Sequence, residues 1–211
     1  MGKGIFITLE GGEGGGKSSQ VRKLGEFLEA KGFNVLLTRE PGGSAGAEAI
    51  RKLLVEGPGG RWDGVTEALL HTAARRDHVI NVIWPALEAG KIVISDRFAD
   101  STVAYQGYAY GIDREALKTL YKAAIGEFKP DITLVLDLPV DAGLARAATR
   151  GGKETRYESM GTEFHERVLQ GFREIAKAEP ARCKLIDATR DIDAIHTDIV
   201  AEVLKVLPAK G

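Results

Sequence analysis

Short apolar runs alternate with longer amphipathic stretches along the whole chain. Runs of strand length occupy residues 5–9, 33–38, 91–95, 132–137 and 184–187. Between them, apolar residues recur every three or four positions, which predicts helices over residues 17–31, 65–89, 99–106, 113–126, 140–149, 162–178 and 192–206. Such alternation is typical of a parallel sheet covered by helices on both faces. We therefore expect a three-layer α/β/α fold with a five-stranded parallel sheet and ligands at the carboxyl ends of its strands.

The longest predicted helix, residues 65–89, carries an apolar and a polar stripe. One stripe holds Leu69, Ala73, Ile80, Ile83 and Leu87, a pattern that is normally directed toward a protein core. The other stripe, on the opposite face, holds His71, Arg75 and His78 at spacings i, i+4 and i+7. Taken alone, that polar stripe fits either a solvated surface or a binding surface.

The composition is that of a folded chain: 44% of its 211 residues are hydrophobic and 28% are charged. At roughly 100–200 residues per domain, we expect residues 1–211 to form a single domain. A net charge of −1 argues against nucleic-acid coats and membrane-surface proteins, which carry basic excess, so we expect neither nucleic acid nor membrane as a partner.

One cysteine, Cys183, is present. It cannot form an internal disulfide, and no Cys/His set has zinc-site spacing. We expect Cys183 to be buried in the core. The apolar start of the chain is too short for a signal-peptide core, and no run approaches the ~20 residues of a membrane span. The sequence therefore predicts a cytoplasmic protein.

A glycine-rich segment follows the first predicted strand, and the first 64 residues hold 16 of the 26 glycines. The pattern Gly-x-x-x-x-Gly-Lys-Ser/Thr is matched, between strand and helix, by Gly11-Gly12-Glu13-Gly14-Gly15-Gly16-Lys17-Ser18. Such a loop binds a polyphosphate through backbone N–H groups, while its lysine reaches the β- and γ-phosphates and its serine ligates Mg²⁺. We expect ATP and Mg²⁺ at this phosphate-binding loop, residues 11–18, and at Ser19.

Magnesium needs further oxygen ligands, usually a carboxylate at the end of a neighbouring strand. Asp96 and Asp137 both follow predicted strands. We favour Asp96, because Arg97 beside it supplies a cation for a transferred phosphoryl group. Asp137 either lies near the site or fixes its own loop. The Asn-Lys-x-Asp sequence of switch GTPases is missing from the chain, which disfavours a regulatory GTPase.

A kinase also holds an anionic acceptor facing the γ-phosphate, so further arginines should gather at strand ends. Arg39 ends the second predicted strand, and Arg75 lies on the polar stripe. Three more segments stand out beside the phosphate-binding loop: Thr38-Arg39-Glu40-Pro41-Gly42-Gly43-Ser44, Asp96-Arg97-Phe98-Ala99-Asp100-Ser101-Thr102-Val103-Ala104-Tyr105-Gln106-Gly107, and Ile186-Asp187-Ala188-Thr189.

With these segments the chain resembles the bacterial thymidylate kinases along nearly its whole length. The resemblance implies a P-loop, adenylate-kinase-like core, usually homodimeric, that phosphorylates dTMP to dTDP with ATP. It implies that Arg97 and Arg39 bind the acceptor phosphate, that Arg75 binds the thymine carbonyl edge, and that Ser101 and Thr102 lie near the base. Tyr105, with Gln106 beside it, would fill the space of a ribose 2′-hydroxyl and so exclude ribonucleotides by clash.

His71 departs from the pattern, because the family usually carries a phenylalanine there that stacks on thymine. Two interpretations stay open: the imidazole stacks on the base, or the base is held differently and His71 is plain helix surface.

The origin of the catalytic cation also follows from the resemblance. Some thymidylate kinases carry an arginine inside the phosphate-binding loop, where this chain has Gly14 and Gly15. Glu13 would face the acceptor's 3′-hydroxyl. The missing charge should come from a lid of about residues 146–158, with Arg150 and Arg156 as catalytic candidates. Arg146 and Ala188 would lie near the adenine.

Two alternatives remain open: a kinase for another nucleoside monophosphate, and a non-catalytic ATP-binding regulator. Arg39, Arg75, Arg97 and Tyr105 argue against the regulator, because an ATP binder has no need of acceptor-side residues.

Overall fold

The computed structural model describes residues 4–56, 60–150, 157 and 160–207, with Arg150 described through its backbone alone. Its sheet has five parallel strands in the order β2-β3-β1-β4-β5. The strands are β1 (Ile5–Gly11), β2 (Val35–Arg39), β3 (Ile92–Asp96), β4 (Ile132–Asp137) and β5 (Cys183–Asp187). The predicted fold class is confirmed, and each predicted strand is present.

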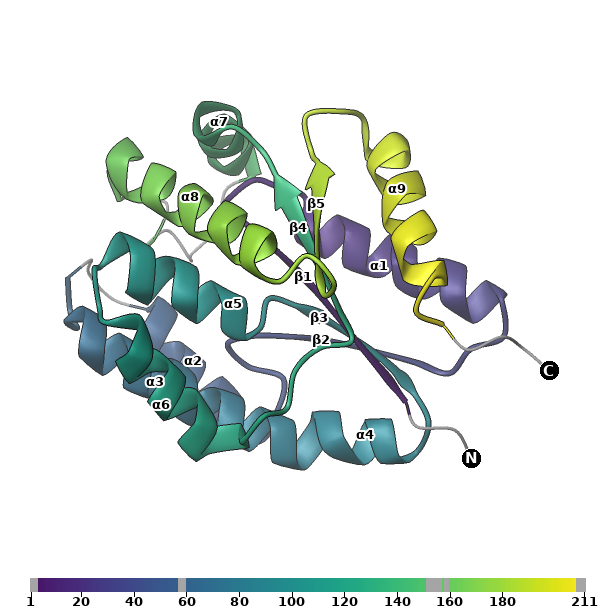
Figure 1. Cartoon of the computed structure of the whole chain (residues 1–211), viewed down its shortest axis with the longest axis horizontal. Helices are drawn as coiled ribbons and strands as arrows, with labels where there is room; N and C mark the ends of the chain where they lie inside the picture. The colour runs from purple at the N-terminus through teal and green to yellow at the C-terminus, as the bar shows by residue number, and fades with distance from the viewer. Residues whose placement is uncertain (1–3, 57–59, 151–156, 158–159, 208–211) are drawn as a thin grey trace.

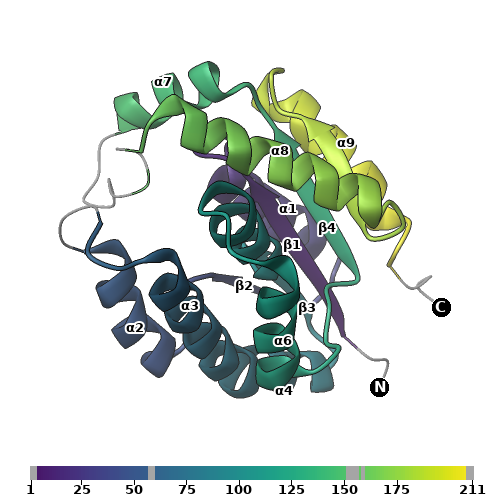
Figure 2. The same cartoon turned by 60° about the vertical axis from the view of Figure 1, so that its left-hand side comes forward.

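Helices cover both faces of the sheet (Figure 1). On one face lie α1 (Lys17–Ala30) and α9 (Ile192–Leu204). On the other face lie α4 (Trp84–Glu88), α5 (Ala99–Thr102) and α8 (Thr162–Ala178). Farther from the sheet, α2 (Ala45–Val55) and α3 (Gly64–His78) lie side by side (Figure 2). The remaining helices are η1 (Val79–Ile83), η2 (Val103–Ala109), α6 (Arg114–Ile125) and α7 (Val140–Arg150).

The central strand β1 sorts its side chains between the two faces. Ile7 and Leu9 are fully buried against α1 and α9. Phe6 points to the opposite face, where its ring meets Phe98 edge-on at 4.9 Å between centroids. Because successive strand residues alternate between faces, Glu10 shares this second face. The strand therefore delivers a carboxylate to the segment that follows β3.

Helix α2 was not predicted, although its N-terminus has a recognisable cap. Ser44 accepts a hydrogen bond from the Ala47 backbone N–H, and Glu48 lies in the first turn, both typical of a helix start. Its inward residues Ala47 and Leu54 are fully buried. The turn residues 41–43 directly before it obscure this helix in the sequence pattern.

The long predicted helix is present as α3, η1 and α4, but the expected orientation of its stripes is wrong. Leu69 is 49% and Ile80 36% exposed, and Ala73 is exposed too, whereas Arg75 and His78 are buried. Only Ile83 and Leu87 of the apolar stripe are buried. The π-helical turn η1 widens the helix before Pro85, which has no N–H to donate, and shifts the phase of the pattern. Ile83 and Leu87 therefore face the core, although Leu69 and Ala73 of the same stripe, before this turn, do not.

Two smaller expectations can be compared with the structure. Cys183 is buried as a free thiol, as predicted, and burial raises its pKa to about 12. Among the described helices, none combines the length and apolar character that a membrane crossing requires.

Candidate active site

The phosphate-binding loop joins β1 to α1, and its glycines take conformations that other residues rarely adopt. Gly14 has φ 68° and Gly16 has φ 86°. A Cβ on Gly14 would lie 2.0 Å from the carbonyl oxygen of Gly143 in α7. No side chain fits at position 14, so an arginine inside the loop is excluded there.

Lys17 folds back over this loop. Its Nζ donates hydrogen bonds to the carbonyl oxygens of Gly11 at 3.1 Å and Gly12 at 2.7 Å. Burial lowers the pKa of Lys17 to about 8, and the nearby Arg97 guanidinium acts in the same direction. An incoming phosphate would restore the ordinary preference of this amine for the charged form.

The two candidate metal carboxylates have different partners. Ser18 Oγ donates to Asp96 Oδ2 at 2.5 Å, which joins the two predicted magnesium ligands. Asp137 instead accepts two hydrogen bonds from Arg173 of α8, at 3.0 and 3.1 Å. Asp96 therefore lies against the phosphate-binding loop, whereas Asp137 is held by an ion pair.

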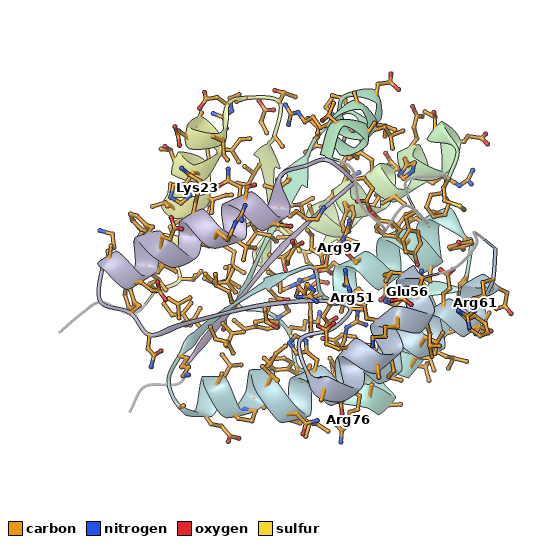
Figure 3. All side chains as sticks on the ribbon, turned by 180° about the vertical axis from the view of Figure 1, so that it is seen from behind. Lys23, Arg51, Glu56, Arg61, Arg76 and Arg97 are labelled. Carbon is orange, nitrogen blue, oxygen red and sulfur yellow. The ribbon has the colours of Figure 1, made fainter. Side chains whose placement is uncertain are left out.

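Arg97 is the centre of the site. Its backbone takes a φ of 68°, the one positive value among the described non-glycine residues, and strain of this kind gathers at functional sites. The guanidinium reaches back to the phosphate-binding loop and forward to η2, and Figure 3 shows it near the middle of the molecule. It donates to Gly11 O (3.1 Å), Ser101 Oγ (3.1 Å), Glu13 Oε1 (2.9 Å) and Tyr105 Oη (3.1 Å).

Glu13 completes this cluster, because the Tyr105 hydroxyl donates to Glu13 Oε1 at 2.8 Å. Burial alone would raise the pKa of Glu13, but the positive charges of Arg97 and Lys17 lower it to about 2. Glu13 is therefore a fixed negative charge at neutral pH, and it holds the Tyr105 hydroxyl and Arg97 in one arrangement.

Glu10 supports the cluster from below and was not predicted as a site residue. It is fully buried and accepts hydrogen bonds from the Phe98 N–H at 2.8 Å and the Ser101 hydroxyl at 2.6 Å. Burial, together with Asp100, raises its pKa to about 7. The alternation of side chains along β1 could have identified Glu10 as a site residue, because it places this charged residue on a buried face of the strand.

Arg75 of α3 is buried against α5, the helix that follows Arg97. Its Nη2 donates to Phe98 O at 3.2 Å and to Thr102 Oγ1 at 3.0 Å. Its Nε donates to Glu40 Oε2 at 2.9 Å. The structure therefore brings together Arg75 and Thr102, two residues that the resemblance places near the base.

His71 and Gln106 lie near the buried carboxylate of Glu67, which is one helical turn before His71 in α3. Glu67 accepts from Gln106 Nε2 at 3.1 Å and from the Tyr157 hydroxyl at 2.9 Å. His71 is half-buried, with Nε2 3.4 Å from Tyr157 Oη. This contact with Tyr157 favours a role for His71 in the site, and stacking of its imidazole on a base stays a prediction. Glu67 and Tyr157 were not predicted as site residues.

Arg39 stands apart from the Arg97 cluster. It ends β2 in register with Asp96, but its guanidinium pairs with both oxygens of Glu48 in α2, at 2.9 and 3.1 Å, and its side chain is 52% exposed. The Arg39 guanidinium therefore already donates to the Glu48 carboxylate, which a phosphate would have to displace in order to bind there.

Arg146 Nη1 of α7 donates to the carbonyl oxygen of Ala188 at 3.2 Å, so the two residues that the resemblance places near adenine lie together. Ser19 is half-buried in the first turn of α1. The side chain of Arg150 and the whole of Arg156 lie outside the described residues, as does most of the expected lid.

Comparisons with known proteins agree with this geometry. A family model described as thymidylate kinase matches residues 9–199. The thymidylate kinase of Caulobacter vibrioides is 52% identical over 207 residues, which cover 98% of this chain and 99% of the relative. That of Gluconobacter oxydans is 50% identical over 213 residues, with 100% and 99% covered.

A crystal structure of thymidylate kinase from Ehrlichia chaffeensis has the same fold, with a TM-score of 0.79 and 36% identity, and the alignment covers 96% of this chain and all of that one. Neither of the two alternatives, a kinase for another nucleoside monophosphate or a regulator, gains support from these relatives. The chain belongs to the thymidylate kinase family.

Proposed function

We propose that this chain transfers the γ-phosphoryl group of ATP to dTMP, giving dTDP and ADP. The observation that carries the proposal is the convergence of Arg97, Lys17 and Glu13 at the carboxyl end of β1. Phosphoryl transfer depends on alignment and on neutralising the charge of the moving group, because the protein forms few covalent bonds in it. Lys17 and Arg97, two cations held at the end of one strand, supply both the alignment and the neutralising charge.

On the donor side, the phosphate-binding loop would bind the β- and γ-phosphates through its N–H groups, and Lys17 would exchange the Gly11 and Gly12 carbonyls for phosphate oxygens. We assign the adenine side to Arg146 and Ala188, which are joined by a hydrogen bond at 3.2 Å. Ser19 lies in the same first turn of α1 as Ser18.

The metal proposed for this site is Mg²⁺, with Ser18 and Asp96 as its protein-side ligands. Two oxygens that already meet at 2.5 Å, beside a loop for phosphates, fit an ion that keeps several waters and takes one or two protein oxygens. No group of three or more acidic, His or Cys ligands occurs among the described residues, so the remaining ligands would be water and phosphate. When bound, Mg²⁺ neutralises charge on the β- and γ-phosphates.

On the acceptor side, Arg97 would hold the dTMP phosphate opposite the γ-phosphate, and Glu13 would face the 3′-hydroxyl. Arg39 would join by exchanging Glu48 for the acceptor phosphate. Tyr105, Gln106, Ser101, Thr102 and Arg75 would surround the sugar and base, with the Tyr105 ring against C2′. The half-buried His71 would stack on the thymine.

The lid arginines Arg150 and Arg156 would supply the remaining positive charge during transfer. The contact of Gly14 with Gly143 supports this assignment, because it leaves no room for an arginine side chain at position 14 of the phosphate-binding loop. We place the lid at about residues 146–158 of a single kinase domain that spans residues 1–211.

A homodimer would cover the exposed apolar stripe of α3. Leu69 and Val65 are 49% and 55% exposed, and Leu53 of the neighbouring α2 is 38% exposed. Exposed apolar residues that gather on adjoining helices mark a protein interface. With its sole cysteine a buried free thiol, the enzyme would work in the cytoplasm.

An ADP-release assay with a panel of acceptors tests the proposed function. With ATP and Mg²⁺, dTMP should give the highest kcat/KM, dUMP a lower one, and UMP and AMP little ADP. ADP release that is independent of any acceptor would indicate an ATPase, and a preference for UMP or AMP would indicate another kinase.

A further inference from the structure

A chain of buried polar side chains runs from β2 to Arg75. Glu40 follows β2 and is 6% exposed, His78 ends α3 and is fully buried, and Arg75 is 4% exposed. The Glu40 carboxylate uses one oxygen for each neighbour: Oε2 accepts from Arg75 Nε at 2.9 Å, and Oε1 lies 3.1 Å from His78 Nδ1. One buried carboxylate therefore joins the arginine to the histidine.

The far side of the imidazole is also fixed. His78 Nε2 lies 2.7 Å from Thr38 Oγ1. A carboxylate only accepts hydrogen bonds, so Nδ1 carries the proton that faces Glu40, and a neutral ring then accepts from the Thr38 hydroxyl. Gly43 closes the space, because a Cβ there would lie 2.4 Å from His78 Nε2. The imidazole has one orientation available.

One nitrogen of the Arg75 guanidinium has no hydrogen-bond acceptor among the described residues. Nε and Nη2 donate to Glu40, Phe98 and Thr102, whereas Nη1 donates to no described residue. Nη1 is also not among the fully buried unpartnered polar atoms of the described residues, which are Gln20 Oε1, His165 Nε2 and His196 Nδ1. It therefore reaches accessible space. The direction in which Nη1 points depends on where Glu40 holds Nε.

We propose that His78, acting through Glu40, is a positioning residue that aims Nη1 of Arg75 at the 4-oxo group of the pyrimidine and so sets base selectivity. This inference rests on the proposed role of Arg75 in binding the base. An N–H donor matches the O4 acceptor of thymine and cannot bond the 4-amino group of cytosine. A tilted guanidinium loses that distinction.

Two substitutions at one position separate positioning from bulk. In His78→Asn the side-chain amide nitrogen takes the place of Nδ1 and still donates to Glu40, while the contact with Thr38 is lost. In His78→Gln the longer amide reaches the place of Nε2 and contacts Thr38, while Glu40 Oε1 loses its donor. Both variants remove the imidazole ring, so if His78 had only a structural role, the two substitutions should change the selectivity for the base equally.

The readout is the ratio of kcat/KM for dTMP to that for dCMP, on the full chain with ATP. We expect His78→Gln to lower this ratio about tenfold or more, the scale of one lost base contact, and His78→Asn to keep it close to the wild-type value. The ratio of dTMP to dUMP should not change in either variant, since both bases carry the same 4-oxo group. If His78→Gln does not fold, Glu40→Asp, which keeps the buried charge but shortens its reach, should lower the dTMP to dCMP ratio instead.

Arg75→Ala distinguishes failure of the inference from failure of its premise. Arg75→Ala should collapse the dTMP to dCMP ratio, and adding His78→Gln to it should lower the ratio no further. An unchanged ratio in Arg75→Ala would overturn both the base-binding role and the inference. A collapsed ratio in Arg75→Ala, with equal effects of His78→Asn and His78→Gln, would overturn the inference alone.

Discussion

The substitution Glu13→Gln tests how the centre of the site is held together. Glu13 and Arg97 lie 2.9 Å apart with side chains each 17% exposed, so water screens the pair only in part. Burial opposes the charge of Glu13, yet Arg97 and Lys17 lower its pKa from 4.5 to about 2. At about 1.4 kcal/mol per pKa unit, this corresponds to about 3 kcal/mol of unfolding free energy at pH 7.

The sign of the pH dependence follows from the lowered pKa. Stability contributed by an acid with a depressed pKa is present above its unfolded value and is lost as the pH falls toward the folded value. The free energy of unfolding of the wild type should therefore exceed that of Glu13→Gln by about 3 kcal/mol at pH 7. This difference should shrink by about 1 kcal/mol at pH 4, which is just below the pKa of Glu13 in the unfolded chain.

Urea unfolding of both proteins at pH 7 and pH 4 measures this gap, and other acids cancel in the difference. Glu166→Gln is the matched control, because Glu166 is exposed on α8 and should shift stability by less than about 0.5 kcal/mol. A gap that is the same at both pH values would refute the electrostatic account of the cluster.

Three further predictions follow from the site. Gly14→Ala should raise the KM for ATP and lower the Tm, because its Cβ meets Gly143 O at 2.0 Å, whereas Gly12→Ala, with nothing within 4 Å of its Cβ, should change both far less; equal effects would argue against the contact. His71→Phe should keep or lower the KM for dTMP and His71→Ala should raise it; an unchanged KM in the alanine variant would remove the stacking role. Of Arg150→Ala and Arg156→Ala, at least one should lower kcat about 10³-fold or more, measured by ADP release, and near wild-type turnover in both would end the lid-arginine assignment.

Local patterns were sufficient for much of the fold and for the donor side of the site. The five strands follow from apolar runs, and the phosphate-binding loop follows from its spacing between strand and helix. Asp96 could be preferred to Asp137 as the partner of Ser18 because Arg97 follows it directly, and the structure places Ser18 Oγ 2.5 Å from Asp96 Oδ2. These features depend on residues near one another in sequence or on strand order alone.

Features that depend on packing between distant elements could not be read from the pattern. The stripes of α3 were assigned to the wrong faces, because the polar Arg75 and His78 are buried there whereas Leu69 and Ala73 are exposed. Nothing in the sequence shows that Arg39 forms an ion pair with Glu48 or that Asp137 forms one with Arg173, since each pair joins different elements. Glu40 and His78 are 38 residues apart, and only the tertiary fold reveals their contact.

A crystal structure with a bisubstrate analogue, adenosine and thymidine joined through five phosphates, tests the central claim most directly. It should show Lys17 and Arg97 both within hydrogen-bond distance of the phosphate chain, with Lys17 released from the Gly11 and Gly12 carbonyls and the thymine 4-oxo group on Arg75 Nη1. An analogue bound with Arg97 turned away from its phosphates, or with the thymine remote from Arg75, would contradict the account.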